Sequence, residues 1–333
     1  MDIYERTQRN PYFDFLRGIA MIMVVGIHTF APLQAGEGEI YDFTANIVRQ
    51  ALNCAVPLFL ALAGYFSAKW LKYNRGGGIA KQIQKVYVPT ILFSLPYFFQ
   101  DLIYAGTSKI VILDVATLVV CGYSVFYFIA VIIQYYLLTP FLTRIGNRKL
   151  LWTSAMISSV SVLAVSYLLY VKQLNLPLIL YAGPCTLWIA FYSLGIYIRK
   201  NNRQYSYTIA VVIMTAGFLL SVIESYQWER FGNISYGIKL SSFIFSAGAI
   251  LVLFSAKTER IIRPNILTHS IVRVGNLSFG IYLTHMLVVN TLEANHLSEW
   301  LVRWLVVLIV SAVLVKLLNW CIPDKYHRLL GIA

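Results

Sequence analysis

Long apolar stretches, separated by short polar segments, recur along almost the whole chain. A helix that crosses a membrane needs about 20 mostly apolar residues, and ten stretches approach that length. They cover residues 13–34, 47–68, 86–104, 124–143, 150–171, 177–198, 207–223, 237–256, 274–292 and 300–320. The pattern predicts an all-α integral membrane protein with about ten transmembrane helices in one bundle. Because the loops are short and no repeat is evident, residues 1–333 are predicted to form a single membrane domain.

Two segments decide how many times the chain crosses. Residues 110–121 are apolar but short, which favours a re-entrant or interfacial piece over a span. The first stretch is longer than the hydrophobic region of a signal peptide, contains Arg17 and lacks a cleavage site of small residues. We expect it to remain in the protein as the first transmembrane helix.

The distribution of basic residues gives the orientation, because cytoplasmic loops collect Lys and Arg. With ten spans, 21 of the 27 basic residues fall on one side. The other side keeps Arg49, Lys109, Lys172, Arg230, Lys239 and Arg303, together with most of the acidic residues. Both termini are therefore predicted to be cytoplasmic.

Composition supports a membrane protein and argues against a soluble one. Hydrophobic residues make up 59% of the chain and charged residues 12%, whereas soluble domains are about half apolar and a quarter charged. The net charge of +13 does not indicate a nucleic-acid partner, because the basic residues are spaced between apolar runs. Cys54, Cys121, Cys185 and Cys321 lack any metal-ligand spacing, so we expect structural thiols and no metal site.

The first apolar stretch carries the most informative polar residues, Arg17 and His28. Eleven residues of helix return almost to the same face, roughly 16 Å farther along the axis. Imidazole accepts a proton near neutral pH, and Arg suits a phosphate or a polarised carbonyl. Taken singly, Arg17 could instead reach the lipid headgroups and His28 a buried carbonyl. Together they predict a catalytic face.

A second polar face is predicted near the C-terminus. Ser278, Tyr282 and His285 stand at i, i+4 and i+7 and form one helical stripe. His285 lies at about the same depth as His28, so the two histidines are predicted to flank one cavity. A hydrogen-bonded seam between helices explains the stripe equally well.

Further candidates are less specific. Lys81 and Lys85 precede the third span and suit donor phosphates, although the charge bias of cytoplasmic loops also accounts for them. Tyr127 could stack on a sugar or belong to an interfacial aromatic belt. Glu37 and Asp42 follow His28 on the outer side, where they could bind an acceptor or remain in a solvated loop.

Several motifs resemble one family, the acyltransferase-3 family of integral membrane O-acyltransferases. The segment from Tyr12 to Ala20, continuing to His28, resembles its Arg-x10-His signature. Val56-Pro57-Leu58-Phe59 with Ala63-Gly64-Tyr65 resembles its second-helix motif, Leu194-Gly195-Ile196-Tyr197 its short glycine motif, and Leu277 to His285 its late Ser-Phe-x-Ile-Tyr-x-x-His motif. Two departures are Ala63, where the family usually has Ser, and Gln82-Ile83-Gln84-Lys85, which replaces a paired-Arg motif.

The resemblance implies a ten-helix domain that transfers an acyl group, commonly acetyl from cytoplasmic acetyl-CoA, to a glycan hydroxyl across the membrane. The short single-domain form resembles the O-acetyltransferases of surface polysaccharides such as enterobacterial common antigen. It implies a bacterial cytoplasmic membrane location, acyl-CoA as co-substrate without a bound cofactor, and a glycan or lipid-linked saccharide as acceptor among the surrounding membrane lipids.

In the predicted mechanism, the phosphates of acyl-CoA lie near Lys81, Lys85 and Arg17. His28 acts as the general base, and Tyr282 or Ser278 donates a hydrogen bond to the oxyanion. An alternative is a transporter in which Arg17, His28 and His285 relay protons or hold an anionic solute. A membrane sensor or scaffold is a third possibility.

Overall fold

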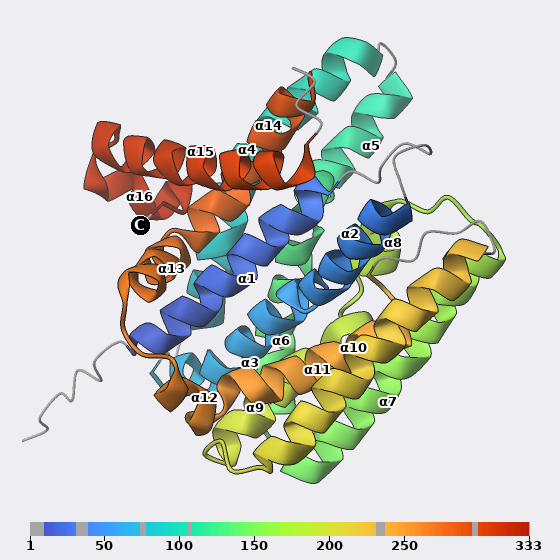
Figure 1. Cartoon of the computed structure of the whole chain (residues 1–333). Coiled ribbons are helices and arrows are strands. Elements are labelled where there is room, and N and C mark those ends of the chain that lie inside the picture. The colour runs from blue at the N-terminus through green and yellow to red at the C-terminus, as the bar shows by residue number, and fades with distance from the viewer. Residues whose placement is uncertain are drawn as a thin grey trace, which may run out of the picture.

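The computed structural model describes residues 10–30, 39–73, 78–105, 108–230, 237–294 and 299–332. Helices dominate these residues, and no strand occurs among them (Figure 1). In chain order the elements are α1 (Pro11–Thr29), α2 (Glu39–Leu52), α3 (Ala55–Tyr73), α4 (Gly78–Ala105), α5 (Ser108–Val119), η1 (Ser124–Phe126), α6 (Tyr127–Leu142), α7 (Asn147–Ser166), η2 (Tyr167–Val171), α8 (Leu178–Ala182), α9 (Cys185–Lys200), α10 (Tyr207–Arg230), α11 (Leu240–Phe254), α12 (Ala256–Ile261), α13 (Ile266–Asn276), α14 (Ser278–Ala294), α15 (Trp300–Cys321) and α16 (Asp324–Leu330). The predicted all-α class is confirmed.

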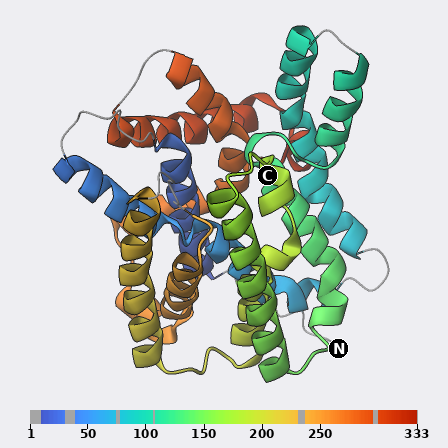
Figure 2. The ribbon, with the colours of Figure 1, turned by 90° about the vertical axis from the view of Figure 1, so that its right-hand side faces the viewer.

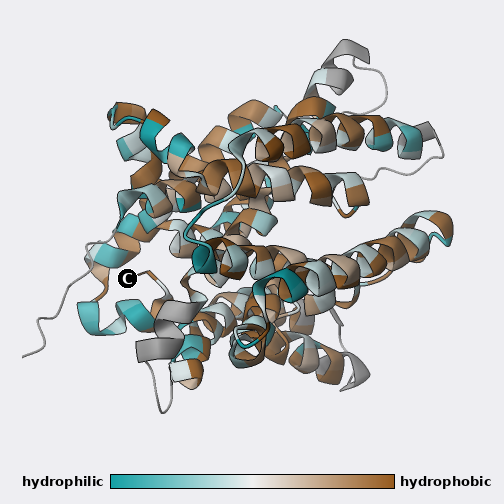
Figure 3. Ribbon diagram, turned by 90° about the horizontal axis from the view of Figure 1, so that it is seen from below, coloured by the Kyte–Doolittle hydropathy of each residue, from teal (hydrophilic) through white to brown (hydrophobic). Residues whose placement is uncertain are grey.

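Six segments of the described chain are long and apolar enough to cross a membrane. They are residues 11–29, 44–67, 124–142, 147–171, 207–228 and 300–321, and α13 with α14 becomes a seventh if the bent pair is one span. The other three predicted spans correspond to α4, which contains Pro89 and Pro96, and to α9 and α11, which have 16 and 15 residues. Hydrophobic residues extend along the helices, and hydrophilic residues gather at many of their ends (Figure 3). The chain is therefore a multi-pass membrane protein, and ten crossings stay a prediction.

Two of the predicted spans are broken. The second changes from α2 to α3 at a turn formed by Asn53 and Cys54. The ninth was predicted to start at residue 274, but α13 and α14 meet there at an angle of 81°. A capping box between Asn265 and Thr268 starts α13 as a separate helix. The polar stripe of the late motif therefore begins at the first residue of α14, directly after the bend.

The short apolar segment at residues 110–121 is a 12-residue helix, α5, rather than a long span. It returns beside α4 as the second arm of a helical hairpin (Figure 1). The hydroxyl of Tyr87 on α4 donates to the carbonyl of Val119, 3.0 Å away, at the end of α5. The chain then turns through η1 into α6, and η1 contacts α14.

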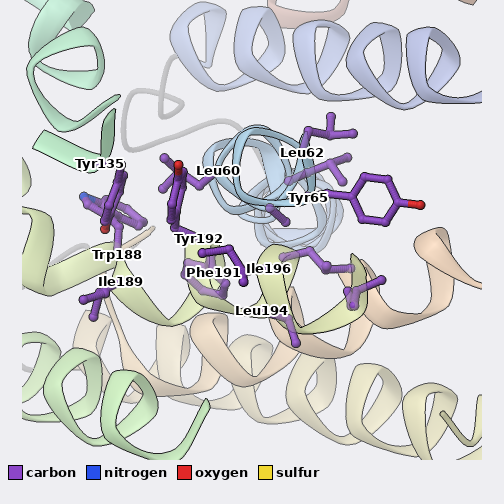
Figure 4. Packing of buried hydrophobic residues seen from close by; sticks show 14 of the residues in the cluster. Leu60, Leu62, Tyr65, Tyr135, Trp188, Ile189, Phe191, Tyr192, Leu194 and Ile196 are labelled. Atoms are coloured by element: carbon purple, nitrogen blue, oxygen red, sulfur yellow. The ribbon is translucent and has the colours of Figure 1, made fainter. Parts of the chain in front are cut away.

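The close crossing of α3 and α9 forms the centre of the larger core. A Cβ atom on Gly195 would lie 2.0 Å from the carbonyl oxygen of Ala61, and one on Gly64 would lie 2.0 Å from that of Tyr192. The two helices therefore touch backbone to backbone, as small residues allow in membrane bundles. Leu60 and Tyr65 of α3 lie against α9, and Tyr192 stacks on Tyr135 at 4.4 Å (Figure 4).

Side-chain contacts join the predicted cytoplasmic segments at one end of the bundle. Lys200 donates to the carbonyls of Thr143 and Ile145, and Arg203 pairs with Glu259 at 2.5 Å. Asn10 also donates to Glu259. The α6–α7 and α9–α10 connections lie together at the lower edge of Figure 2. The grouping agrees with the alternation that the basic residues predict.

Candidate active site

Arg17 and His28 lie along one face of α1, as their spacing predicts, and line the same cavity. Asn10 caps α1 by accepting from the amide of Tyr12 at 2.9 Å, and Pro11 occupies the first helical position. The cavity has a volume of about 390 Å³. Its lining comes from α1, α3, α4, η1, α6 and α14 and includes Arg17, Val24, His28, Phe59, Phe66, Gln82, Val86, Tyr127, Tyr136, Ser278, Phe279 and Tyr282. We call it the first cavity.

Arg17 is held at one end of the first cavity by neighbours on α1 and α3. Its guanidinium pairs with the buried Asp14 at 2.5 Å and lies over the ring of Phe66, 5.4 Å from the ring centroid. About a third of the Arg17 side chain remains exposed. The ion pair fixes the direction of the guanidinium and leaves further N–H donors for a ligand in the cavity.

His28 and His285 approach each other inside the bundle, with ring centroids 5.4 Å apart. Nδ1 of the fully buried His285 lies 2.7 Å from the carbonyl oxygen of Tyr282, so Nδ1 carries the proton and Nε2 is an acceptor. Nε2 is buried and has no hydrogen-bond partner. His28 likewise forms no hydrogen bond with any residue that the structure describes. The two histidines are thus a facing pair, but His28 lines the first cavity and His285 does not, so the prediction that both flank one cavity holds for His28 alone.

The two predicted hydroxyl donors of α14 differ in their surroundings. The hydroxyl of Tyr282 donates to the carbonyl of Val125 at 2.7 Å, which joins α14 to η1. Ser278, the first residue of α14, lines the first cavity, and its hydroxyl makes no hydrogen bond with the described residues. Ser278 is therefore the better placed hydroxyl donor, and Tyr282 shapes the cavity wall.

A second cavity, of about 340 Å³, shares His28 and part of its lining with the first. Val24, His28, Val56 and Tyr127 line both cavities. The second cavity is otherwise lined by aromatic and polar side chains, including Arg49, Asn53, Tyr170, Tyr181, Trp188, Ser242 and Ser246. Since Arg17 contributes only to the first cavity and Arg49 only to the second, the two spaces extend from His28 in different directions.

A buried polar network supports the wall of the second cavity. Arg49 donates to the side-chain oxygen of Asn53 at 2.5 Å, and Asn53 donates to Gln50 and to Ser242. Behind them the fully buried Lys239 donates to Gln50, and Ser221 donates to the same oxygen. This network was not predicted from the sequence. Its signal was present, because Arg49 and Lys239 are two of the few basic residues on the acid-rich side.

The less specific candidates of the sequence lie in different parts of the structure. Lys81 is exposed and lines none of the three cavities, whereas Lys85 lines a third one. Tyr127 lies at the junction of the first two cavities. Glu37 lies outside the described residues, and Asp42 belongs to α2 but its side chain is outside them.

The described residues contain no group of three His, Cys, Asp or Glu side chains that could hold a metal ion. The four cysteines are all free thiols. The chemistry available at the junction of the cavities is therefore that of imidazole, hydroxyl and guanidinium groups.

A family model described as an acyltransferase domain, that of the acyltransferase-3 family, matches residues 10–320. No curated protein and no solved structure gives a match. The matched residues include Arg17, His28 and the polar stripe of α14, and they end before α16.

Proposed function

The chain belongs to the acyltransferase-3 family, and from this premise we propose that it transfers an acyl group from cytoplasmic acyl-CoA to a glycan hydroxyl. Acetyl is the proposed acyl group, and the proposed acceptor is an extracytoplasmic or lipid-linked saccharide. The observation that carries the proposal is that two cavities share His28 in their linings. A direct acyl transfer brings two substrates to one base, and two cavities that share His28 fit that requirement.

The first cavity suits the acyl-CoA donor. Its lining is mainly aliphatic and aromatic along α3 and α6, as an extended pantetheine arm requires, and Arg17 and Gln82 stand on its polar side. The helical rise places Arg17 roughly 16 Å from His28 along α1. With that separation, the phosphates of acyl-CoA can lie near the cytoplasmic end of α1 while its thioester lies near His28.

The second cavity suits a sugar acceptor. Tyr170, Tyr181 and Trp188 provide aromatic faces, and Arg49, Asn53 and Ser242 provide hydrogen-bonding groups. Binding sites of this kind combine apolar and aromatic walls with a few placed polar groups. Tyr127 belongs to both cavities, so it can contact the acceptor close to the reacting thioester.

The proposed reaction is a direct displacement with His28 as general base. His28 accepts the proton of the acceptor hydroxyl while the hydroxyl oxygen bonds to the thioester carbonyl carbon. The C–S bond then breaks, and the proton is returned from His28 to the departing CoA thiolate. Ser278 donates to the developing oxyanion. The products are the glycan ester and free CoA.

The test uses purified full-length protein in nanodiscs with radiolabelled acetyl-CoA and a membrane glycolipid extract. Wild type is compared with His28→Ala and with His269→Ala, a control that removes an exposed histidine of α13. We expect label in the glycolipid for wild type and the control, and none above background for His28→Ala with unchanged thermal stability. Near wild-type transfer by His28→Ala would refute the role of His28. Solute flux without any acyl donor would instead support the transporter.

A further inference from the structure

A third cavity, of about 320 Å³, lies beside the first one and contains basic side chains from two distant parts of the chain. Lys85 comes from α4 and Arg328 from α16. Asn276, Leu277, Phe279 and Gly280 form another wall, at the bend between α13 and α14. No acidic side chain is among its described lining residues.

Two structural elements, α4 and the start of α14, contribute to the lining of both the third cavity and the first. Gln82 and Val86 of α4 line the first cavity, and Lys85 of the same turns lines the third. Ser278 lines the first, Leu277 and Gly280 line the third, and Phe279 lines both. The third cavity is therefore next to the end of the first that contains Arg17, Gln82 and Ser278.

The C-terminal segment that carries Arg328 is firmly docked. The amide of the buried Ile332 donates to the carbonyl of His327 at 3.1 Å, and Gly331 adopts a left-handed conformation with φ of 66°. A Cβ atom on Gly331 would lie 2.6 Å from the ring of Phe279. Arg328 is thus held on a segment that packs against the residue shared by the two cavities.

We propose that Lys85 and Arg328 form the binding site for the phosphate groups of the acyl-CoA donor. The inference rests on the proposed function, which supplies a donor with phosphates at the Arg17 end of the first cavity. Guanidinium binds phosphate oxygens through two parallel hydrogen bonds, and the Lys ammonium adds a compact positive charge. Arg328 lies on α16, beyond residues 10–320 that the family model matches, so it joins the site from outside the matched segment.

The test compares two acyl donors, acetyl-CoA and acetyl-pantetheine, which carries the same thioester but no phosphate. Arg328→Gln and Lys85→Gln are measured beside Lys325→Gln, a control on the same helix that does not line the cavity. We expect KM for acetyl-CoA to rise about tenfold to a hundredfold in Arg328→Gln, because a charged hydrogen-bond pair is lost. The kcat value and the kinetics with acetyl-pantetheine stay unchanged. Arg328→Lys recovers part of the loss.

Two kinetic results overturn the inference. One is an equal loss with both donors, which would make Arg328 a structural residue. The other is no loss with either donor. Anionic lipid headgroups present the same phosphate chemistry, so the assays are repeated in nanodiscs of zwitterionic and of anionic lipid. An Arg328 effect that requires anionic lipid would assign the site to a headgroup and reject the donor.

Binding of radiolabelled CoA separates this inference from the proposed function. Weaker CoA binding by Arg328→Gln than by wild type supports the phosphate site even if no glycan is acylated. Equal binding by the two proteins rejects it even if transfer occurs. Turnover of acetyl-pantetheine by wild type supports acyl transfer without reference to the phosphate site.

Discussion

At the scale of single residues, the facing histidines have different tasks. His28 lines both cavities, whereas His285 is fully buried and lines neither. The backbone carbonyl of Tyr282 fixes the proton of His285 on Nδ1, so its Nε2 is available as an acceptor beside His28. We therefore propose that His285 is a positioning residue whose Nε2 accepts a hydrogen bond from the protonated form of His28.

Replacing His285 by Phe tests this role. The Phe side chain keeps an aromatic ring at this position but removes the acceptor, so we expect kcat to fall about tenfold or more with KM for acetyl-CoA unchanged. Steady-state kinetics at several pH values measure both parameters. His285→Gln, which keeps an acceptor atom, should recover part of kcat. A merely structural histidine would instead lower thermal stability and leave the kcat of the folded protein unaffected.

The sequence predicts some site residues better than others, for physical reasons. Arg17 and His28 share a helix, and their spacing alone places them on one face, as the structure confirms. Arg49 and Lys239 come together from distant segments, so no local period links them. Both are buried, at 8% and 0% exposure, and so is Arg303 at 5%, which donates to the carbonyl of Thr29. The preference of cytoplasmic loops for Lys and Arg does not explain basic residues on the predicted extracytoplasmic side. Such residues are thus a usable signal in the sequence for buried polar groups.

At the scale of elements, the α3–α9 crossing aligns the helices that line the two cavities. Gly195→Ala tests the crossing, because its new methyl would meet the carbonyl of Ala61 at 2.0 Å. We expect overpacking to cost about 1–3 kcal/mol or more and to lower the thermal unfolding temperature in detergent. Gly146→Ala is the matched control, since nothing lies within 4 Å of a Cβ there. Equal unfolding temperatures for both variants would contradict the close crossing.

Hydropathy predicted where most helices lie but not where they break. The 81° bend before α14 and the turn at Asn53–Cys54 lie within or beside stretches that remain apolar on both sides. A hydropathy window averages over such a break, and the capping residues that mark it are few. Ser278, just after the bend, lines the first cavity, and Leu277 and Gly280 line the third, so this arrangement was outside the reach of the sequence pattern.

At the scale of the whole molecule, Glu259 ties together three distant segments at the predicted cytoplasmic end. Burial acts to raise its pKa, but hydrogen bonds from Asn10 and Arg203 and the charge of Arg203 outweigh burial, so the pKa lies below its usual value of about 4.5. The stabilising contribution is therefore fully present above pH 4.5 and is lost as the pH falls through the lowered pKa.

Thermal unfolding between pH 3 and pH 7 checks this contribution. We expect wild type to lose more stability than Glu259→Gln as the pH falls below about 4.5, and the variant to be less stable at pH 7. Glu299→Gln, which removes an exposed carboxylate that makes no cap hydrogen bond, serves as the control and should follow wild type. Parallel pH profiles for wild type and Glu259→Gln would show that the ion pair contributes nothing to folding.

The number of times the chain crosses the membrane depends on the short helices α9 and α11. A helix of 16 residues extends roughly 24 Å, less than the roughly 30 Å of a hydrocarbon core, so α9 crosses only with its flanking residues. With ten spans and cytoplasmic termini, Asn175 before α9 is extracytoplasmic, and Gln204 and Lys257 are cytoplasmic. All three side chains are exposed.

A single cysteine at each of these positions, with the four native cysteines replaced, reports its side of the membrane through an impermeant thiol reagent. We expect Asn175→Cys to react in intact cells, and Gln204→Cys and Lys257→Cys to react only after permeabilisation. Reaction of Asn175→Cys and Gln204→Cys from the same side would mean that α9 does not cross, and both the ten-span topology and the transfer of acyl groups between opposite faces would then have to be abandoned.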